Sequence, residues 1–198
     1  MIARTFGSSR FVYNYFLSLR KNTYETTGET IGFVKSSAML TQLKKELTWL
    51  KEVDSIPLQE ALRDLDLAYQ HFFRRVKQGE KPGYPHFKSK RDKRKSYKTK
   101  QHISNGKPTI WVASYHVRLP KLGLVKCRIS KEVKGRILSA TVSQNSSGKY
   151  FVSLCCTDVE TDTLPNTGAA VGIDLGLKAF AVASDGTEYP NHKYLAKS

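Results

Sequence analysis

The chain has 198 residues and a formal net charge of +16, with 33 Lys and Arg residues against 17 Asp and Glu. Hydrophobic residues make up 39%, which is too much apolar material for a disordered chain and enough for a core without disulfides or a structural metal. No apolar run approaches the ~20 residues of a membrane-spanning helix, and the N-terminus lacks a signal-peptide core, which argues against integral membrane and secreted proteins.

Residues 1–80 carry the periodicity of helices. Apolar side chains repeat at helical spacing from Phe11 to Leu19, after Ser8 and Ser9, which are predicted to cap the helix start. Further stripes cover residues 39–50 and 58–76. Asp54 precedes the last stripe and Gly79 follows it, as at a helix start and a helix end.

The charge is concentrated in the middle of the chain. Residues 71–136 contain 20 Lys and Arg against 3 Asp and Glu, whereas residues 1–70 carry 9 against 8 and residues 137–198 carry 4 against 6. Like charges at this density repel one another unless a polyanion neutralises them. The stretch therefore favours a groove for a nucleic-acid backbone. A solvated basic loop and an anionic membrane surface are the alternatives, and the membrane reading lacks an amphipathic helix.

From Tyr97 onward the period changes to two. Short strands are predicted at 109–112, 115–119, 124–129, 137–144 and 149–157, with a hairpin turn at 145–148. Short strands with alternating basic residues suit a small antiparallel barrel with one charged wall that holds nucleic acid, although a purely structural barrel is the alternative. The three cysteines, Cys127, Cys155 and Cys156, form no C-x-x-C pair, so reduced thiols and no zinc site are expected.

The last zone follows a linker at residues 164–168. Residues 169–173 are small and apolar and predict a buried central strand that Asp174 interrupts, before a tight turn at 184–186. A carboxylate buried at a strand end is costly unless a metal ion compensates it, and a turn-capping aspartate is the alternative.

Nine segments, in order, resemble the TnpB/OrfB family of small insertion sequences, which are compact RNA-guided DNA endonucleases related to type V CRISPR effectors. The segments are RTFG at 4–7, RFVYNYFL at 10–17, WLKEV at 49–53, PLQEAL at 57–62, AYQHFFR at 68–74, GYPHFK at 83–88, LPKLG at 119–123, GIDLGLK at 172–178 and SDG at 184–186.

The resemblance implies an α+β protein of three parts. Residues 1–80 would form a helical recognition domain, residues 81–165 a basic linker and wedge β-barrel, and residues 168–198 the start of a RuvC-like nuclease domain with an RNase-H-like fold. Guide RNA and target DNA are the implied partners, in the cytoplasm of a prokaryote at the nucleoid. Asp174 matches the first catalytic ligand of a site that uses Mg²⁺.

Nucleic-acid contacts are expected from the end of the third helix, from the basic run at residues 88–100 and from the barrel. These residues are Arg74, Arg75, Lys77, Lys88, Lys90, Arg91, Lys93, Arg94, Lys95, Tyr97, Lys98, Lys100, Lys121, Lys126 and Arg128. Ser37 and Gln59 are weaker candidates for contacts to the target-adjacent motif.

The family's remaining site residues, a second-motif Glu, zinc-ribbon cysteines and a third-motif Asp, have no counterpart up to Ser198. The chain is therefore expected to keep guide-RNA and DNA binding, as a truncated endonuclease that does not cut DNA by itself. A non-catalytic nucleic-acid-binding module, such as a repressor-like relic, is the alternative. A third reading takes VGIDLG at 171–176 as the phosphate motif of actin-, hexokinase- and chaperone-type ATPases. In those proteins the motif usually opens the chain and continues into Thr or Ser, whereas here it stands late in the chain and Leu177 and Lys178 follow it.

Overall fold

The structure is a computed structural model that describes residues 1–92, 95–160 and 167–192. The chain divides into two compact units, Met1–Glu160 and Thr161–Ser198. Most of the predicted linker at 164–168 lies outside the described residues. No helix in the described ranges is long and apolar enough to cross a membrane.

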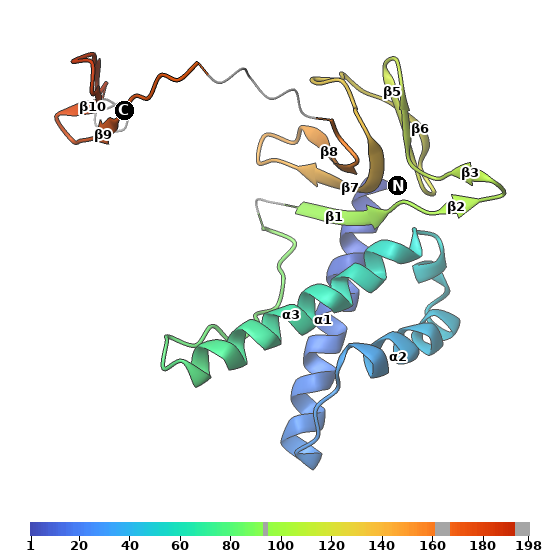
Figure 1. The fold of residues 1–198 in the computed structure, drawn as a ribbon. Helices are drawn as coiled ribbons and strands as arrows, with labels where there is room; N and C mark the ends of the chain where they lie inside the picture. The colour runs from blue at the N-terminus through green and yellow to red at the C-terminus, as the bar shows by residue number, and fades with distance from the viewer. Residues whose placement is uncertain (93–94, 161–166, 193–198) are drawn as a thin grey trace. The chain divides into compact units, whose positions relative to one another are not determined.

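The larger unit begins with its helices: α1 (Ile2–Thr27), α2 (Phe33–Glu46), the 3-10 turn η1 (Thr48–Lys51) and α3 (Ser55–Lys77) (Figure 1). The predicted apolar stripes meet in one core, in which Phe16, Leu17 and Leu62 are at most 2% exposed. Burial of each such side chain is worth roughly 1.5–3 kcal/mol, so this core stabilises the helices far more than local propensity does.

The start of α1 differs from the prediction. The helix begins at Ile2 with Met1 as its N-cap, and Ser8, instead of capping the helix, is buried within it. The reason is tertiary: Phe6 is 6% exposed and belongs to the core of the sheets, so packing extends the helix by two turns beyond the local signal. The start of α3 is as predicted, because Asp54 is its N-cap and accepts a hydrogen bond from the Ile56 amide at 3.2 Å.

The second part of the larger unit is antiparallel β-structure. Its strands are β1 (Lys95–Lys100), β2 (Ile103–Ser104), β3 (Lys107–Pro108), β4 (Trp111–Ala113), β5 (His116–Leu119), β6 (Gly123–Lys126), β7 (Arg136–Gln144) and β8 (Tyr150–Thr157). They form sheets of order β1-β7-β8 and β4-β5-β6 and the hairpin β2-β3. The five predicted strands correspond to β4–β8 within three residues at each end, and the predicted hairpin turn joins β7 to β8.

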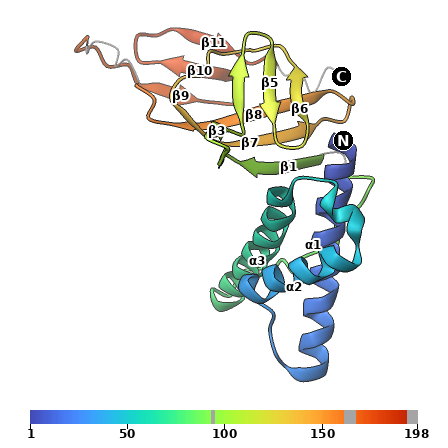
Figure 2. The same ribbon diagram turned by 90° about the vertical axis from the view of Figure 1, so that its right-hand side faces the viewer.

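The two three-stranded sheets share one core, to which Tyr97, Ile110, Val117 and Val142 contribute. Figure 2 shows β5 and β6 lying against the sheet that contains β7 and β8, with the helices beyond β1. The expected closed barrel is not present among the described strands, because no ladder joins β1-β7-β8 to β4-β5-β6. A barrel needs pairing at every seam. Here the two sheets share a packed core, and the Gln101 side chain, just after β1, exchanges two hydrogen bonds with the backbone of Ile110, just before β4. The α+β class is confirmed.

The smaller unit is a three-stranded antiparallel sheet of order β11-β10-β9, formed by β9 (Ile173–Leu175), β10 (Ala179–Ala183) and β11 (Glu188–Pro190). The tight turn at 184–186 is confirmed, with Gly186 at φ 85°. The predicted buried strand at 169–173 is wrong: residues 169–172 are not in a strand, and Ile173 and Leu175 are 63% and 70% exposed. In this unit β9 is an edge strand without the cover that a buried central strand requires.

Candidate nucleic-acid interface

The basic stretch 71–136 runs from the end of α3 through β1–β6 to the start of β7. Among its described cations, ion pairs join Lys88 to Asp64 at 3.8 Å, Lys100 to Glu60 at 2.7 Å and Arg136 to Asp158 at 3.1 Å. Most of its other lysine and arginine side chains are exposed. The positive charge is therefore largely presented to solvent rather than neutralised within the protein.

One group of cations lines a cavity of about 1170 Å³ between the helices and the β2-β3 hairpin, here named the hairpin groove. Its walls come from the end of α2, η1, the start of α3, the hairpin and the strands β4 and β5, with Trp111 among them. Its cations are Lys44, Lys51, Lys107, Arg118 and Lys121.

The carboxylate that lines the hairpin groove is already engaged in the fold. Asp54 is buried, caps α3 and accepts a hydrogen bond from the Thr99 hydroxyl at 2.5 Å. The groove therefore sets five cations against one carboxylate, and that carboxylate is already hydrogen-bonded within the fold. This arrangement suits a bound polyanion, because phosphate groups supply the missing negative charge.

The hairpin shapes the groove through its turn. Asn105 and Gly106 both have positive φ, 49° and 71°, which is the backbone of the tight turn that Asn-Gly favours. The Arg118 guanidinium donates to the Pro108 carbonyl at 3.3 Å and ties the hairpin to β5. The Asn-Gly pair is a sequence signal for this hairpin, and with it Lys107 could be placed directly after the turn.

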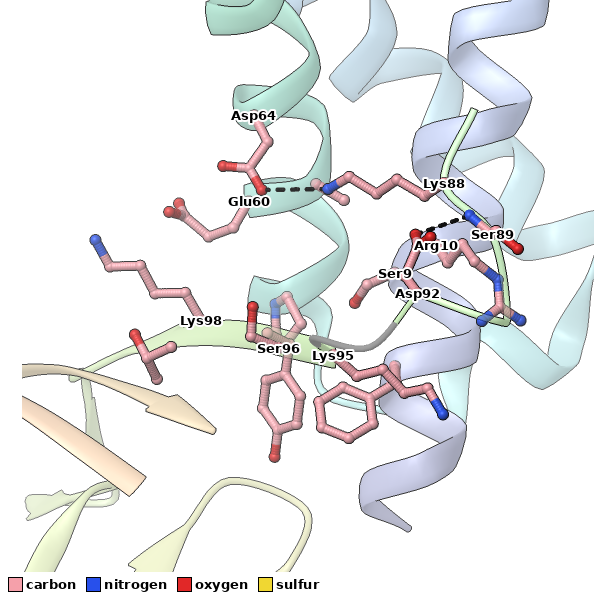
Figure 3. A pocket seen from close by; sticks show the side chains of 15 residues that line it. Ser9, Arg10, Glu60, Asp64, Lys88, Ser89, Asp92, Lys95, Ser96 and Lys98 are labelled. Atoms are coloured by element: carbon pink, nitrogen blue, oxygen red, sulfur yellow. Dashed lines mark hydrogen bonds and ion pairs between the residues drawn. The ribbon is translucent and has the colours of Figure 1, made fainter. Parts of the chain in front are cut away.

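A second cavity, of about 400 Å³, lies between α1, α3, residues 88–92 and β1 (Figure 3). It is here named the strap cavity. Both signs of charge line it: Glu60, Asp64 and Asp92 with Arg10, Lys88, Lys95 and Lys98.

Charges around the strap cavity offset one another. Glu60 accepts from Lys100 at 2.7 Å and from Arg63 at 3.3 Å. Burial, more than any other cause, raises the pKa of Asp64 above its usual range, while Lys88 acts in the opposite direction. Because 61% of the Asp64 side chain is exposed, this shift carries little stability. The net attraction for a polyanion is therefore smaller here than in the hairpin groove.

The residues predicted at the end of α3 lie in its last turn. Arg74 and Lys77 are exposed, whereas Arg75 is half-buried beside Gly83, where a Cβ would come within 2.6 Å of its Nη1. A side chain at residue 83 would therefore oblige the Arg75 guanidinium to move. Of the basic run, Lys90 and Arg91 are exposed, and Lys93 and Arg94 lie outside the described residues.

The predicted barrel residues divide into groups. Lys121 lies in the hairpin groove, while Lys126 and Arg128 are exposed at the end of β6 and beyond it. Lys95, Lys98 and Lys100 are on β1 near α3. In α2, Ser37 is half-buried, and Gln59 is exposed on α3.

Tyr97 is a core residue. It is 7% exposed and its ring packs edge-on against Phe6, with 5.6 Å between ring centres. Burial is also the main reason that the pKa of the Tyr97 hydroxyl is raised above its ordinary value. The ring is therefore not presented as a platform on which a base could stack.

Asp174 lies at the middle of β9, opposite Val182 on β10, and it is exposed. The neighbouring turn residue Asp185 accepts a hydrogen bond from the Thr187 amide at 2.9 Å, which lowers the pKa of Asp185. In the described ranges no three His, Cys, Asp or Glu side chains stand together as metal ligands. No described side chains gather around Asp174 as a set of metal ligands, so no catalytic step is assigned to it.

Comparison with known proteins places these features in a family. A family model described as a helix-turn-helix domain of OrfB proteins from IS605-type elements matches residues 1–29. A candidate RNA-guided DNA endonuclease of Streptomyces pristinaespiralis is 34% identical over 203 residues, which covers 98% of this chain and 46% of the relative. InsQ of Escherichia coli K12, also named as a candidate RNA-guided DNA endonuclease, is 34% identical over 92% of this chain and 43% of its own length.

The chain belongs to the TnpB/OrfB family. A third relative, the virulence protein VsdF of Salmonella dublin, is 34% identical over 44% of this TnpB/OrfB chain and 79% of VsdF. The chain spans less than half the length of the two endonuclease relatives. In this member of the TnpB/OrfB family, the segment that matches the helix-turn-helix model forms the single helix α1 and its Gly28 cap.

Proposed function

We propose that this chain binds guide RNA and target DNA as the nucleic-acid-binding portion of an RNA-guided DNA endonuclease. The observation that carries the proposal is the hairpin groove, where five cations line one cavity whose carboxylate is already hydrogen-bonded within the fold. The names of the two long relatives support the choice of RNA and DNA as partners.

The division of labour is part of the same proposal. Residues 1–80 would act as the recognition domain, residues 81–165 as the linker and wedge, and residues 168–198 as the start of the RuvC-like part. Ser37 and Gln59 would contact the target-adjacent motif, and the exposed lysines and arginines would contact phosphates. Such contacts set affinity and register, while pairing to the guide would read sequence.

We assign cleavage to the whole endonuclease and not to Asp174 and the other described residues alone. Asp174 would contribute one ligand to a divalent ion, Mg²⁺ by the family resemblance, and the other ligands are not among the described residues. A module that binds nucleic acid without cutting it is the second candidate, because the described interface needs no metal to hold phosphates.

The test is the salt dependence of binding to a labelled structured RNA and to a DNA duplex, measured by fluorescence anisotropy. If about 6–10 phosphates are contacted, affinity falls about 10³–10⁵-fold between 50 and 200 mM salt. An affinity that does not change with salt would overturn the proposal. Asp174→Ala is expected to leave affinity unchanged, since the substitution removes none of the cations to which binding is assigned.

A further inference from the structure

Residues 84–92, here named the strap, connect the end of α3 to β1 without forming a helix or strand. Pro85 is buried, whereas the other eight residues of the strap are exposed. Even Phe87 keeps 59% of its surface exposed. Apolar burial therefore contributes little to the position of the strap beyond its first two residues, and polar contacts have to fix the rest.

The first anchor of the strap is on α3. The Tyr84 hydroxyl lies 3.0 Å from the Tyr69 hydroxyl, and the Tyr84 ring packs edge-on against Tyr69 and Phe72. These contacts hold the strap at its beginning and leave the basic residues further along unsupported.

The second anchor is the side chain of Asn14 on α1, 74 residues earlier in the chain. Its Nδ2 donates to the Lys88 carbonyl at 2.9 Å, and the Lys88 amide donates to its Oδ1 at 2.8 Å. One neutral side chain thus satisfies both backbone groups of one residue, as a neighbouring strand would. Only asparagine and glutamine offer a donor and an acceptor in this form.

The Lys88 side chain reinforces the same anchor. Its Nζ lies 4.1 Å from the centre of the Tyr13 ring and 3.8 Å from the Asp64 carboxylate. Figure 3 shows Lys88 reaching from the strap toward Asp64 on α3. The strap is therefore fixed to both α1 and α3 at this residue.

A tight turn follows directly and carries the two cations that come after Lys88. The Ser89 amide donates to Asp92 at 2.9 Å, and the Arg91 amide donates to the Ser89 hydroxyl at 3.1 Å. The side chains of Lys90 and Arg91 are exposed from this turn.

We propose that Asn14 is a positioning residue that clamps the strap onto α1 and so presents Lys90 and Arg91 to nucleic acid. The inference rests on the proposed function. The two cations repel each other and the charges that follow, so an unanchored segment would have to be ordered at the moment of binding. With the clamp, the segment loses its conformational entropy when the protein folds, so this loss does not weaken binding.

The experiment compares Asn14→Ala and the double variant Lys90→Ala/Arg91→Ala, separately and combined, in binding a labelled structured RNA. Loss of two hydrogen bonds shifts a local equilibrium by roughly tenfold or more, so Asn14→Ala is expected to weaken binding about tenfold. In the combined variant the losses of binding free energy are expected to be far from additive. Cations that are no longer positioned contribute little to binding, so their removal then changes the affinity little.

Asn22→Ala, an exposed amide on the same helix, is the matched control and is expected to bind as the wild type does. Hydrogen exchange gives an independent readout: the Lys88 amide is expected to lose protection in Asn14→Ala while the amides of α1 keep theirs. If Asn14→Ala does not fold, Asn14→Asp replaces it, because it keeps the acceptor for the Lys88 amide, removes the donor to the Lys88 carbonyl and is expected to show the same non-additivity.

The outcomes separate the two proposals. If the wild type binds neither RNA nor DNA, the proposed function fails and the positioning role fails with it. If the wild type binds and Lys90→Ala/Arg91→Ala has no effect, or the losses are additive, the positioning role of Asn14 is overturned and the proposed function stands.

Discussion

The hairpin groove and the strap cavity contain similar numbers of cations, but the carboxylates around these cations differ. In the strap cavity Glu60, Asp64 and Asp92 stand among the lysines, and ion pairs hold neighbouring elements together. In the hairpin groove the lining carboxylate of Asp54 belongs to the fold, through its cap and its bond to Thr99. The difference teaches that local counter-charge, more than the number of cations, separates a binding surface from a structural one.

The largest expected effect comes from neutralising the hairpin groove. Replacing four of its cations by alanine removes up to four phosphate contacts, so affinity for RNA or duplex DNA falls on the order of 100-fold and the salt slope decreases by about 3–4. Anisotropy titrations at several salt concentrations measure both. The four substitutions are Lys51→Ala, Lys107→Ala, Arg118→Ala and Lys121→Ala.

A matched control removes the same charge from exposed lysines outside both cavities. It is expected to change affinity by no more than about threefold, through net charge alone. Equal losses in the two variants would show that total charge, and not the groove, determines binding. The control substitutions are Lys21→Ala, Lys35→Ala, Lys45→Ala and Lys149→Ala.

Asp54→Ala tests the structural role that the comparison assigns to this carboxylate. It removes the cap of α3 and the partner of the buried Thr99 hydroxyl, so the free energy of unfolding is expected to fall by about 1–3 kcal/mol. Chemical denaturation measures the change, and Asp54→Asn, which keeps an acceptor, should lose less. A weakened affinity in Asp54→Asn at full stability would contradict the view that this carboxylate serves only the fold.

Glu60→Gln is expected to give the smallest effect. It releases Lys100 and Arg63 from their ion pairs, so nucleic-acid affinity should rise about twofold to threefold, as expected from pairs worth at most about 1 kcal/mol. Glu46→Gln, an exposed glutamate on α2, changes the net charge equally and serves as the control. A decrease in affinity would mean that the strap cavity contributes to binding through its ion pairs.

Much of the fold follows from patterns within a few residues. Helical spacing located the three helices, alternation located β4–β8, and Asp54 marked the start of α3. Features that depend on distant contacts did not follow. Local signals predict a cap at Ser8, because the packing of Phe6 on the sheets depends on residues distant in sequence.

The candidate site shows the same limit. The basic run and Lys121 could be selected from local charge, whereas Lys44 and Lys51 join the hairpin groove only through the fold. The contact between Asn14 and Lys88 joins residues 74 positions apart, and no local sequence pattern predicts it. Asp174 was expected to be buried because its neighbours are small and apolar, yet apolar composition does not itself supply cover.

Helix α1 takes part in two cores at once. Phe6 lies among the strands, and Phe16, less than three turns later, lies among the helices. A fragment that begins after α3 would lose Phe6 from its interior, and a fragment that ends with α3 would expose it to water. The helical and β parts are therefore expected to unfold in one cooperative transition, and dissection of the larger unit at their junction should yield two unstable pieces.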